Sequence, residues 1–166
     1  YRVNNVTKVY GDRIILDRVN FDIETGQRVA IMGPSGVGKT TLIKILSARD
    51  FPDSGEVYLA GKPTHEFTSR SELSSKIGVI HQQYDLVPNL SVLQNVLAGS
   101  LGRWNFVTSL VSLFRPNELE NAMQAIDQIG LNGYESQKTL YLSRCEQQRT
   151  AIARLLVQDP EIILAD

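Results

Sequence analysis

Short apolar runs, separated by turn signals and helical patterns, mark the first half of the chain and its last stretch. Val3, Val6 and Val9 lie in a β-prone opening, and Gly11-Asp12 predicts a hairpin turn into a second strand over residues 14–23. Further strands are expected at residues 29–32, 56–60, 77–81 and 162–166, and helices at residues 40–48 and 69–76. Strands that alternate with helices predict an α/β fold.

The middle of the chain, from residue 86 to residue 140, shows helical patterns and no strand signal. Helices are expected over residues 91–97, 107–114 and 116–129. The last of them carries one apolar stripe, formed by Leu119, Ala122, Met123, Ile126 and Ile129. Ser143 and Glu146 then have the S-x-x-E form of a capping box, which opens a helix through residue 156. The α/β fold is therefore predicted to contain a helical insert.

A glycine-rich turn joins the strand expected at residues 29–32 to the next helix. Its residues fit the pattern G-x-x-x-x-G-K-[ST]: Gly33, Pro34, Ser35, Gly36, Val37, Gly38, Lys39 and Thr40. In this pattern backbone N–H groups curl around a polyphosphate, Lys39 reaches the outer phosphates, and the Thr40 hydroxyl ligates magnesium. The following helix points its positive end at the same place. The alternative is a glycine-rich turn with an incidental lysine, and the complete pattern between a strand and a helix argues against it.

Composition limits the classes of function. The chain has 166 residues, of which 42% are hydrophobic and 21% are charged, as in a globular protein. Seventeen basic and eighteen acidic residues nearly cancel, which gives no electrostatic case for a nucleic-acid partner. The single cysteine, Cys145, excludes an internal disulfide and a cysteine-built metal site. No apolar run approaches the ~20 residues of a membrane span, so we expect any link to a membrane to come through a partner.

Three further residues are candidates for ligand contact. Tyr10, just before the hairpin turn, is either an ordinary strand aromatic or a platform on which a flat ring stacks. Gln82 follows an apolar strand, and ligands of open α/β sheets sit at the carboxyl ends of strands. The last strand likewise ends in a carboxylate, that of Asp166.

Five sites, taken in this order, resemble the ATP-binding subunit of ABC transporters over the whole length of the chain. They are Tyr10 as the adenine-stacking aromatic, residues 33–41 as the Walker A loop, Gln82 as the Q-loop glutamine, residues 142–149 as the signature, and residues 162–166 as the Walker B strand. The order and spacing of all five are far more specific than a Walker A loop alone. On this resemblance we expect Tyr10 to stack on the base.

The resemblance implies a P-loop NTPase core, with a mostly parallel sheet and an antiparallel β edge, and a helical insert subdomain. Residues 1–85 and 150–166 would form the nucleotide-binding core. Residues 86–149 would form the helical subdomain, which includes the signature.

The resemblance also implies the ligands and the roles of the site residues. Two ATP molecules are sandwiched between two copies of the domain, so that the phosphate loop of one copy and the Ser143 helix terminus of the other hold each ATP. The residues expected to contact ATP are Tyr10, Gly33, Pro34, Ser35, Gly36, Val37, Gly38, Lys39, Thr40, Thr41 and Ser143. Lys39, Gln82 and Asp166 are the expected catalytic residues. Thr40, Gln82 and Asp166 are the residues expected at the Mg²⁺ site.

The expected partners follow from the same resemblance. They are membrane permease subunits, a second ATPase subunit in a homodimer and, indirectly, a solute-binding protein, with no nucleic acid. The surface near residues 82–102 is expected to dock a helix of the permease. The chain is therefore expected at the cytoplasmic face of the inner membrane, as a peripheral subunit.

The helical insert resembles that of phosphonate importer ATPases, on residues 90–103 and 109–114. The implied function is ATP binding and hydrolysis coupled to phosphonate import through a permease. Other small-solute importers are an alternative, because helical inserts vary among subfamilies. A soluble ABC-type ATPase that serves translation or repair is a third possibility, and the transporter-like insert at residues 86–114 speaks against it.

The chain departs from the family pattern at its signature and at its end. The family has two glycines where this chain has Arg144 and Cys145, and glycine there allows close backbone approach to a γ-phosphate. Arg144 either contacts the phosphate or marks an abandoned site. The base glutamate, the dimer-contacting loop and the switch histidine expected after Asp166 are absent, which indicates a fragment or a truncated product. We expect this form to have little or no ATPase activity, and the rival function is that of a non-hydrolysing nucleotide-binding fragment or pseudoenzyme.

Overall fold

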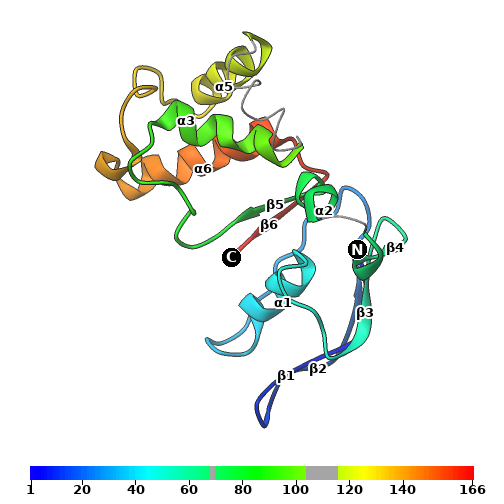
Figure 1. Ribbon diagram of the computed structural model, residues 1–166. Coiled ribbons are helices and arrows are strands. Elements are labelled where there is room, and N and C mark those ends of the chain that lie inside the picture. The colour runs from blue at the N-terminus through cyan, green and yellow to red at the C-terminus, as the bar shows by residue number, and fades with distance from the viewer. Residues whose placement is uncertain (68–69, 104–115) are drawn as a thin grey trace. The chain divides into compact units, whose positions relative to one another are not determined.

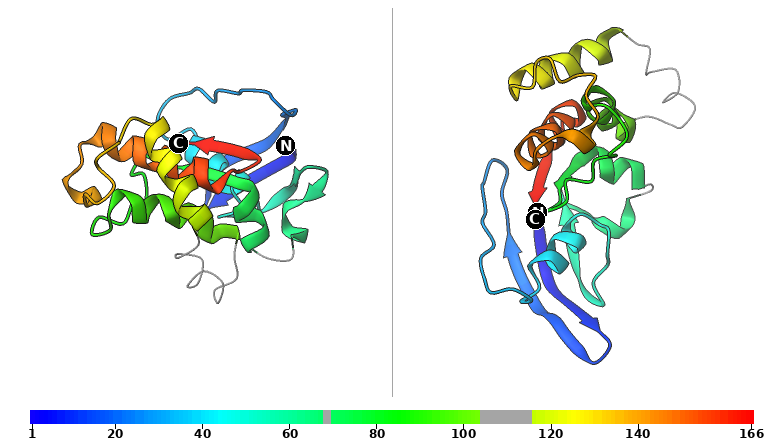
Figure 2. Two further views of the ribbon diagram at one scale, coloured as in Figure 1. Left: turned by 90° about the horizontal axis from the view of Figure 1, so that it is seen from above. Right: turned by 90° about the vertical axis from the view of Figure 1, so that its left-hand side faces the viewer.

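The computed structural model describes residues 1–67, 70–103 and 116–166. The chain divides into two compact units, one formed by Tyr1–Leu73 with Asp166 and the other by Ser74–Ala165. Figure 1 labels their helices and strands, and Figure 2 gives two further views. The division into a nucleotide-binding core and a helical subdomain at residues 86–149 stays a prediction.

The first unit contains a four-stranded antiparallel sheet in the order β2-β1-β3-β4. The strands are β1 (Arg2–Tyr10), β2 (Arg13–Asp22), β3 (Ser54–Leu59) and β4 (Lys62–Pro63). The predicted hairpin is confirmed, because β1 pairs with β2 across a turn at Gly11. A register irregularity between Val3 and Val6, where Asn5 has a φ of 49°, lets two valines three positions apart both be buried.

Helix α1 (Lys39–Leu46) follows the glycine-rich turn and buries Leu42, Ile43, Ile45 and Leu46. The strand predicted at residues 29–32 is wrong, since residues 27–34 have no regular secondary structure. Met32 is 89% exposed, although the segment is apolar. A strand is stable only where a neighbouring strand pairs its backbone groups, and none of the strand pairs in the described part of the chain includes this segment.

The second unit contains two parallel strands, β5 (Ile77–Ile80) and β6 (Ile162–Ala165), as the apolar runs predicted. Helix α6 (Arg144–Gln158) packs closely on β5 at Gly78. A Cβ atom at Gly78 would lie 2.6 Å from Leu155 Cδ2 and 2.7 Å from Pro160 Cγ. Glycine therefore permits the close approach of helix and strand at this point.

Three helices, α3 (Val92–Leu97), α5 (Pro116–Gln128) and α6, pack together in the second unit. Their shared core is apolar and consists of Val92, Val96, Leu97, Ala122, Ala125, Ile126, Leu131, Leu142, Ala153 and Val157. The predicted stripe of α5 is only partly correct, because Leu119 and Met123 are exposed. The helix predicted at residues 107–114 lies outside the described residues, as do residues 109–114 of the phosphonate-like insert.

Short helical segments complete the described chain. They are η1 (Thr64–Glu66), α2 (Arg70–Lys76), η2 (Ala98–Arg103) and η3 (Thr139–Tyr141). Antiparallel strands, a parallel strand pair and several helices together confirm the predicted α/β class. Among the described residues, no helix has the length and apolarity needed to cross a membrane.

Candidate functional site

The glycine-rich turn of the first unit is an exposed loop that ends where α1 begins. Gly36 and Gly38 have φ angles of 81° and 105°, which glycine adopts more readily than any other residue. A Cβ atom at Gly38 would lie 2.9 Å from the Ile15 carbonyl oxygen, so β2 backs the loop closely here. Gly38 is also the N-cap residue of α1, and no side chain caps this helix terminus. The terminus therefore offers backbone N–H donors to an anion.

Lys39 is the first residue of α1, and its side chain folds back over the loop. Its Nζ donates to the Gly33 carbonyl oxygen at 2.9 Å and to the Pro34 carbonyl oxygen at 2.8 Å. Two neutral carbonyl groups thus hold the ammonium against the loop. An anion that enters the loop meets this positive charge together with the N–H donors of the helix terminus.

Thr40 and Asp166 lie together in the first unit, although 126 positions separate them in the sequence. The Thr40 hydroxyl donates to Asp166 Oδ1 at 3.1 Å. A hydroxyl and a carboxylate oxygen are hard ligands of the kind that Mg²⁺ prefers, and Mg²⁺ is usually bound by few protein groups together with phosphates and water. The pair therefore fits the predicted magnesium site.

Tyr10 ends β1 beside the hairpin turn, and the residue is 47% exposed. Its hydroxyl donates to Asp50 Oδ2 at 2.5 Å, and the Lys8 ammonium lies 5.3 Å from the centre of its ring. Neither Lys8 nor Asp50 was among the predicted site residues. A weak signal exists for Lys8, because a charged residue two positions from Val6 on a strand falls on the buried side.

Gln82 belongs to the second unit and is exposed in the turn that follows β5. Tyr84 and Asp85 of this turn have φ angles of 59° and 46°, which residues other than glycine adopt uncommonly. Arg154 of α6 holds them, because its Nη1 donates to the Asp85 carbonyl oxygen at 2.7 Å and its Nη2 to that of Tyr84 at 2.9 Å. The sequence carries no signal for this role, since an arginine on a helix is ordinarily solvated.

Ser143 caps α6 in the second unit through the predicted capping box. Its hydroxyl and its backbone N–H both donate to Glu146 Oε2 at 2.7 Å, and the Glu146 N–H donates to Ser143 Oγ at 3.3 Å. These bonds, with that of the Ser143 hydroxyl first, hold the pKa of the Glu146 carboxyl below its usual range. Arg144 and Cys145 are exposed at the same terminus. The capping box thus pairs the Ser143 and Glu146 N–H groups of this terminus with side chains of the helix itself.

The sequence profile of the ABC transporter family matches residues 16–166, which include the loop, the Q-loop turn and the start of α6. The chain belongs to the ABC transporter family. Among curated relatives, the phosphonates import ATP-binding protein PhnC 2 of Haloquadratum walsbyi is 42% identical over 99% of this chain and 56% of its own length. The phosphonates import ATP-binding protein PhnC of Anaeromyxobacter dehalogenans is 40% identical over 96% of this chain and 32% of its own length.

Solved structures of ABC transporter cassettes share the fold. A dimeric structure of the cassette MJ0796 in a post-hydrolysis state, bound to ADP and Pi, has a TM-score of 0.84 and 36% identity, and the match covers 99% of this chain and 72% of that one. The structure of cbiO1 from Clostridium perfringens, part of the ABC transporter complex cbiONQ, has a TM-score of 0.80 and 27% identity. The match covers 99% of this chain and 64% of the cbiO1 chain. These likenesses confirm the predicted P-loop NTPase class.

The chain is shorter than its relatives in the ABC transporter family. It spans 56% and 32% of the lengths of the two curated relatives described above. The residue roles predicted for Lys39, Gln82, Asp166 and Ser143 remain predictions.

Proposed function

We propose that this chain is the ATP-binding part of a transporter subunit that couples ATP binding and hydrolysis to phosphonate import. The observation that carries the proposal is the loop of the first unit, where Lys39, Thr40 and Asp166 adjoin an uncapped helix terminus. An ammonium, backbone N–H donors and hard oxygen ligands are the groups that a magnesium-bound triphosphate requires. The ABC transporter family uses ATP with Mg²⁺, which supports the same assignment.

Lys39 would exchange its present partners for phosphate. Its ammonium donates to two neutral carbonyl oxygens, those of Gly33 and Pro34. A charged phosphate oxygen is a stronger acceptor than a carbonyl oxygen, so a triphosphate bound in the loop takes over these hydrogen bonds.

Thr40 and Asp166 are the residues of the first unit that would hold Mg²⁺. The role of Gln82 as a further Mg²⁺ ligand is proposed on the family resemblance alone. Bound Mg²⁺ neutralises part of the charge of the β- and γ-phosphates. Ser143 is proposed to face the ATP of a second copy of the domain. The dimeric state of the MJ0796 cassette supports this arrangement.

The transported solute is proposed from the relatives, because an ATPase subunit has no contact with it. Both curated relatives above are named as phosphonate import proteins. We propose a permease as the partner, docked near residues 82–102, where Val87 is exposed after the Q-loop turn. The chain would then lie at the cytoplasmic face of the inner membrane, and a solute-binding protein would contribute indirectly.

A second candidate function is nucleotide binding without turnover. The observation that favours it is the Glu146 carboxylate, which satisfies the Ser143 hydroxyl and backbone N–H at the terminus of α6. A carboxylate repels the γ-phosphate that the signature helix of a working ATPase would contact. In this case the chain binds Mg-ATP through the first unit and drives no transport.

Calorimetric titration with Mg-ATP tests the proposed nucleotide site. Lys39→Ala should weaken binding by about a hundredfold, because it removes charge-assisted hydrogen bonds to phosphate. Lys44→Ala is the matched control, since Lys44 is an exposed lysine in the last turn of the same helix. Equal affinities of Lys39→Ala and Lys44→Ala would contradict the assignment.

Co-purification tests the proposed solute. The chain should be retained by the membrane permease of a phosphonate importer and not by the permease of an importer for another small solute. Val87→Glu should reduce this retention, because it places a charge on the proposed docking surface. Equal retention by both permeases would leave the ATP-binding assignment intact and contradict the assignment to phosphonate.

A further inference from the structure

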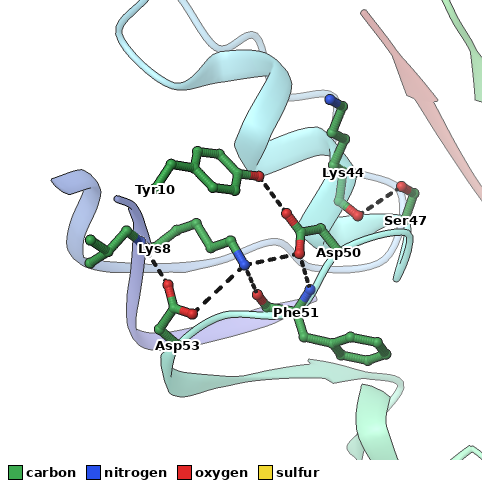
Figure 3. Close-up of polar contacts among 8 residues, drawn as sticks. Lys8, Tyr10, Lys44, Ser47, Asp50, Phe51 and Asp53 are labelled. Carbon is green, nitrogen blue, oxygen red and sulfur yellow. Dashed lines mark hydrogen bonds and ion pairs between the residues drawn. The ribbon is translucent and has the colours of Figure 1, made fainter. Parts of the chain in front are cut away.

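We propose that Lys8 and Asp50 are positioning residues that hold the ring of Tyr10 in place for the base of a bound nucleotide (Figure 3). The inference rests on the proposed function, because it requires a nucleotide whose phosphates lie in the glycine-rich loop. All three side chains belong to the first unit, which also contains that loop.

The first step is the attachment of the ring. The Tyr10 hydroxyl donates to Asp50 Oδ2 at 2.5 Å, while the residue as a whole remains 47% exposed. A tyrosine has two side-chain torsions, so a hydrogen bond at its far end restricts the direction of the ring. A tyrosine that only filled a core would be buried, whereas Tyr10 is held at its hydroxyl and 47% of the residue's surface is exposed.

The second step is the support of Asp50 by Lys8. The Lys8 side chain is 10% exposed, and its Nζ donates to Asp50 Oδ1 at 2.9 Å and to the Phe51 carbonyl oxygen at 2.7 Å. Asp53 Oδ1 lies 3.8 Å from the same ammonium. A buried ammonium is stable only with such partners, so Lys8 and Asp50 restrict each other. The Lys8 ammonium also lies 5.3 Å from the Tyr10 ring centre, within the range of a cation–π contact.

The protonation states keep this arrangement intact at neutral pH. The Tyr10 hydroxyl and then the Lys8 ammonium lower the pKa of the Asp50 carboxyl, which therefore stays ionised. The hydrogen bond to Asp50 raises the pKa of the Tyr10 hydroxyl, which therefore stays a donor. The same carboxylate raises the pKa of Lys8.

The third step connects this group to the phosphate loop. The Asp50 N–H donates to the Lys44 carbonyl oxygen at 3.2 Å, so Asp50 is attached to the carboxyl end of α1. Helix α1 begins at Lys39 of the loop. On the other side, Tyr10 pairs with Arg13 at the start of β2, and Ile15 of β2 backs Gly38 of the loop. The ring is therefore joined to the loop through both the hairpin and the helix.

The link between the Tyr10 ring and the phosphate loop indicates a ligand that carries both phosphates and a flat base. Stacking between a flat base and an aromatic ring is strengthened when the ring is already oriented, because less side-chain entropy is lost on binding. Phosphate contacts in the loop would be unaffected by the ring. Lys8 and Asp50 are thus expected to contribute to the part of the affinity that depends on the base, and not to the part that depends on the phosphates.

The test compares Mg-ATP with inorganic tripolyphosphate in the presence of Mg²⁺, both titrated calorimetrically into the full chain. Tyr10→Ala should lower the affinity for Mg-ATP by about tenfold, the scale of one base–aromatic stacking contact. Asp50→Ala and Tyr10→Phe should each lower the affinity for Mg-ATP by about threefold, the scale of the free energy needed to order one side chain. The affinity for tripolyphosphate should not change in any of them. Asp17→Ala is the matched control, because Asp17 is an exposed aspartate of β2 that pairs with its neighbour Arg18.

The double variant Asp50→Ala/Tyr10→Phe should lose no more affinity for ATP than either single variant, since both changes break the same hydrogen bond. Tyr10→Phe keeps the ring and alters an exposed position, so it remains informative if Asp50→Ala fails to fold. An unchanged affinity for ATP in Tyr10→Phe, or an equal loss for ATP and tripolyphosphate, overturns the inference while the proposed function stands. Failure of the unaltered chain to bind either compound overturns both.

Discussion

The amino ends of α1 and α6 are built in opposite ways. Helix α1 begins after Gly38, has no side-chain cap and has no acidic residue in its first turn. Helix α6 begins after Ser143, whose hydroxyl and N–H are both bonded to the Glu146 carboxylate. Every helix start has unpaired N–H groups and a partial positive charge that need a partner. Helix α6 pairs the N–H groups of Ser143 and Glu146 with its own side chains, and helix α1 has no side-chain cap.

The difference makes the terminus of α1 better suited to an external anion than the terminus of α6, where the ATP of a second copy would meet the Glu146 carboxylate. An external anion at α1 gains N–H donors and the Lys39 ammonium. An anion at α6 would have to compete with the Glu146 carboxylate, which is adjacent and costs no entropy of association. Within this chain, the capacity to bind triphosphate is therefore expected to lie in the first unit.

The largest effect is expected from distorting the glycine-rich loop at the start of α1. Gly38→Ala should abolish detectable binding of Mg-ATP, because a Cβ atom there would lie 2.9 Å from both the Ile15 carbonyl oxygen and Leu16 Cδ2. It should also destabilise the fold by about 1–3 kcal/mol, since alanine at a φ of 105° is strained. Gly61→Ala is the control, with a φ of 81° and open space for its Cβ atom. Calorimetry measures the Mg-ATP affinity of both variants and thermal unfolding measures their stability, so an effect of backbone strain can be told from an effect on the loop. Unchanged Mg-ATP affinity in Gly38→Ala would refute this role of the loop.

A smaller effect is expected from removing the side chains at residues 144 and 145 at the start of α6. Arg144→Gly/Cys145→Gly removes two exposed side chains from the start of α6 and should favour contact with ATP held by a second copy. In Mg-ATP, sedimentation should then show a dimer that is stronger by about tenfold, the scale of one charge-assisted hydrogen bond. Arg144→Lys/Cys145→Ser serves as the control that keeps side chains at both positions. If the glycine variant and this control dimerise equally, crowding at residues 144 and 145 does not limit the contact.

The smallest effect is expected from changing the charge of the α6 cap. Glu146→Gln keeps the shape of the side chain and should lower the Tm by about 2 °C at pH 7, with no change in Mg-ATP affinity. The folded-state pKa of Glu146 is depressed, so its ionised form stabilises the fold above the ordinary value of 4.5, and this stabilisation is lost as pH falls through the lower folded value. As the pH is lowered from 7 to 3, the Tm values of the Glu146→Gln variant and the unaltered chain should therefore converge. A constant gap over this range would mean that the charge of Glu146 is not responsible.

Local patterns predicted much of the structure. The Gly11 turn, the Pro116 start of α5 and the capping box at Ser143 depend on neighbouring residues, and each was correctly predicted. The glycine-rich loop is likewise a local pattern, and the structure has it directly before α1. These features depend on backbone preferences within a few residues, which the sequence displays directly.

Local patterns predicted few of the features that depend on distant residues, and the Thr40–Asp166 pair was expected only from the family resemblance. The apolar run at residues 29–32 indicated a strand, but a strand also needs a neighbour that pairs with it, and composition cannot supply that information. The Lys8–Asp50 bond spans 42 positions, and the Arg154–Tyr84 bond spans 70. Lys8 is buried on β1 and needs a partner, and the sequence does not indicate which residue that is.

Amide NMR spectra of the ¹⁵N-labelled chain, recorded during titration with Mg-ATP at a concentration where the chain is monomeric, compare the two helix termini in one experiment. The difference between an open terminus and a self-capped one predicts saturable shifts for the amides of residues 36–40. It predicts no shifts for the amides of residues 143–147, where the capping box pairs the Ser143 and Glu146 N–H groups and Glu146 adds a negative charge. Saturable shifts at residues 143–147 with none at residues 36–40 would contradict the assignment of triphosphate binding to the first unit.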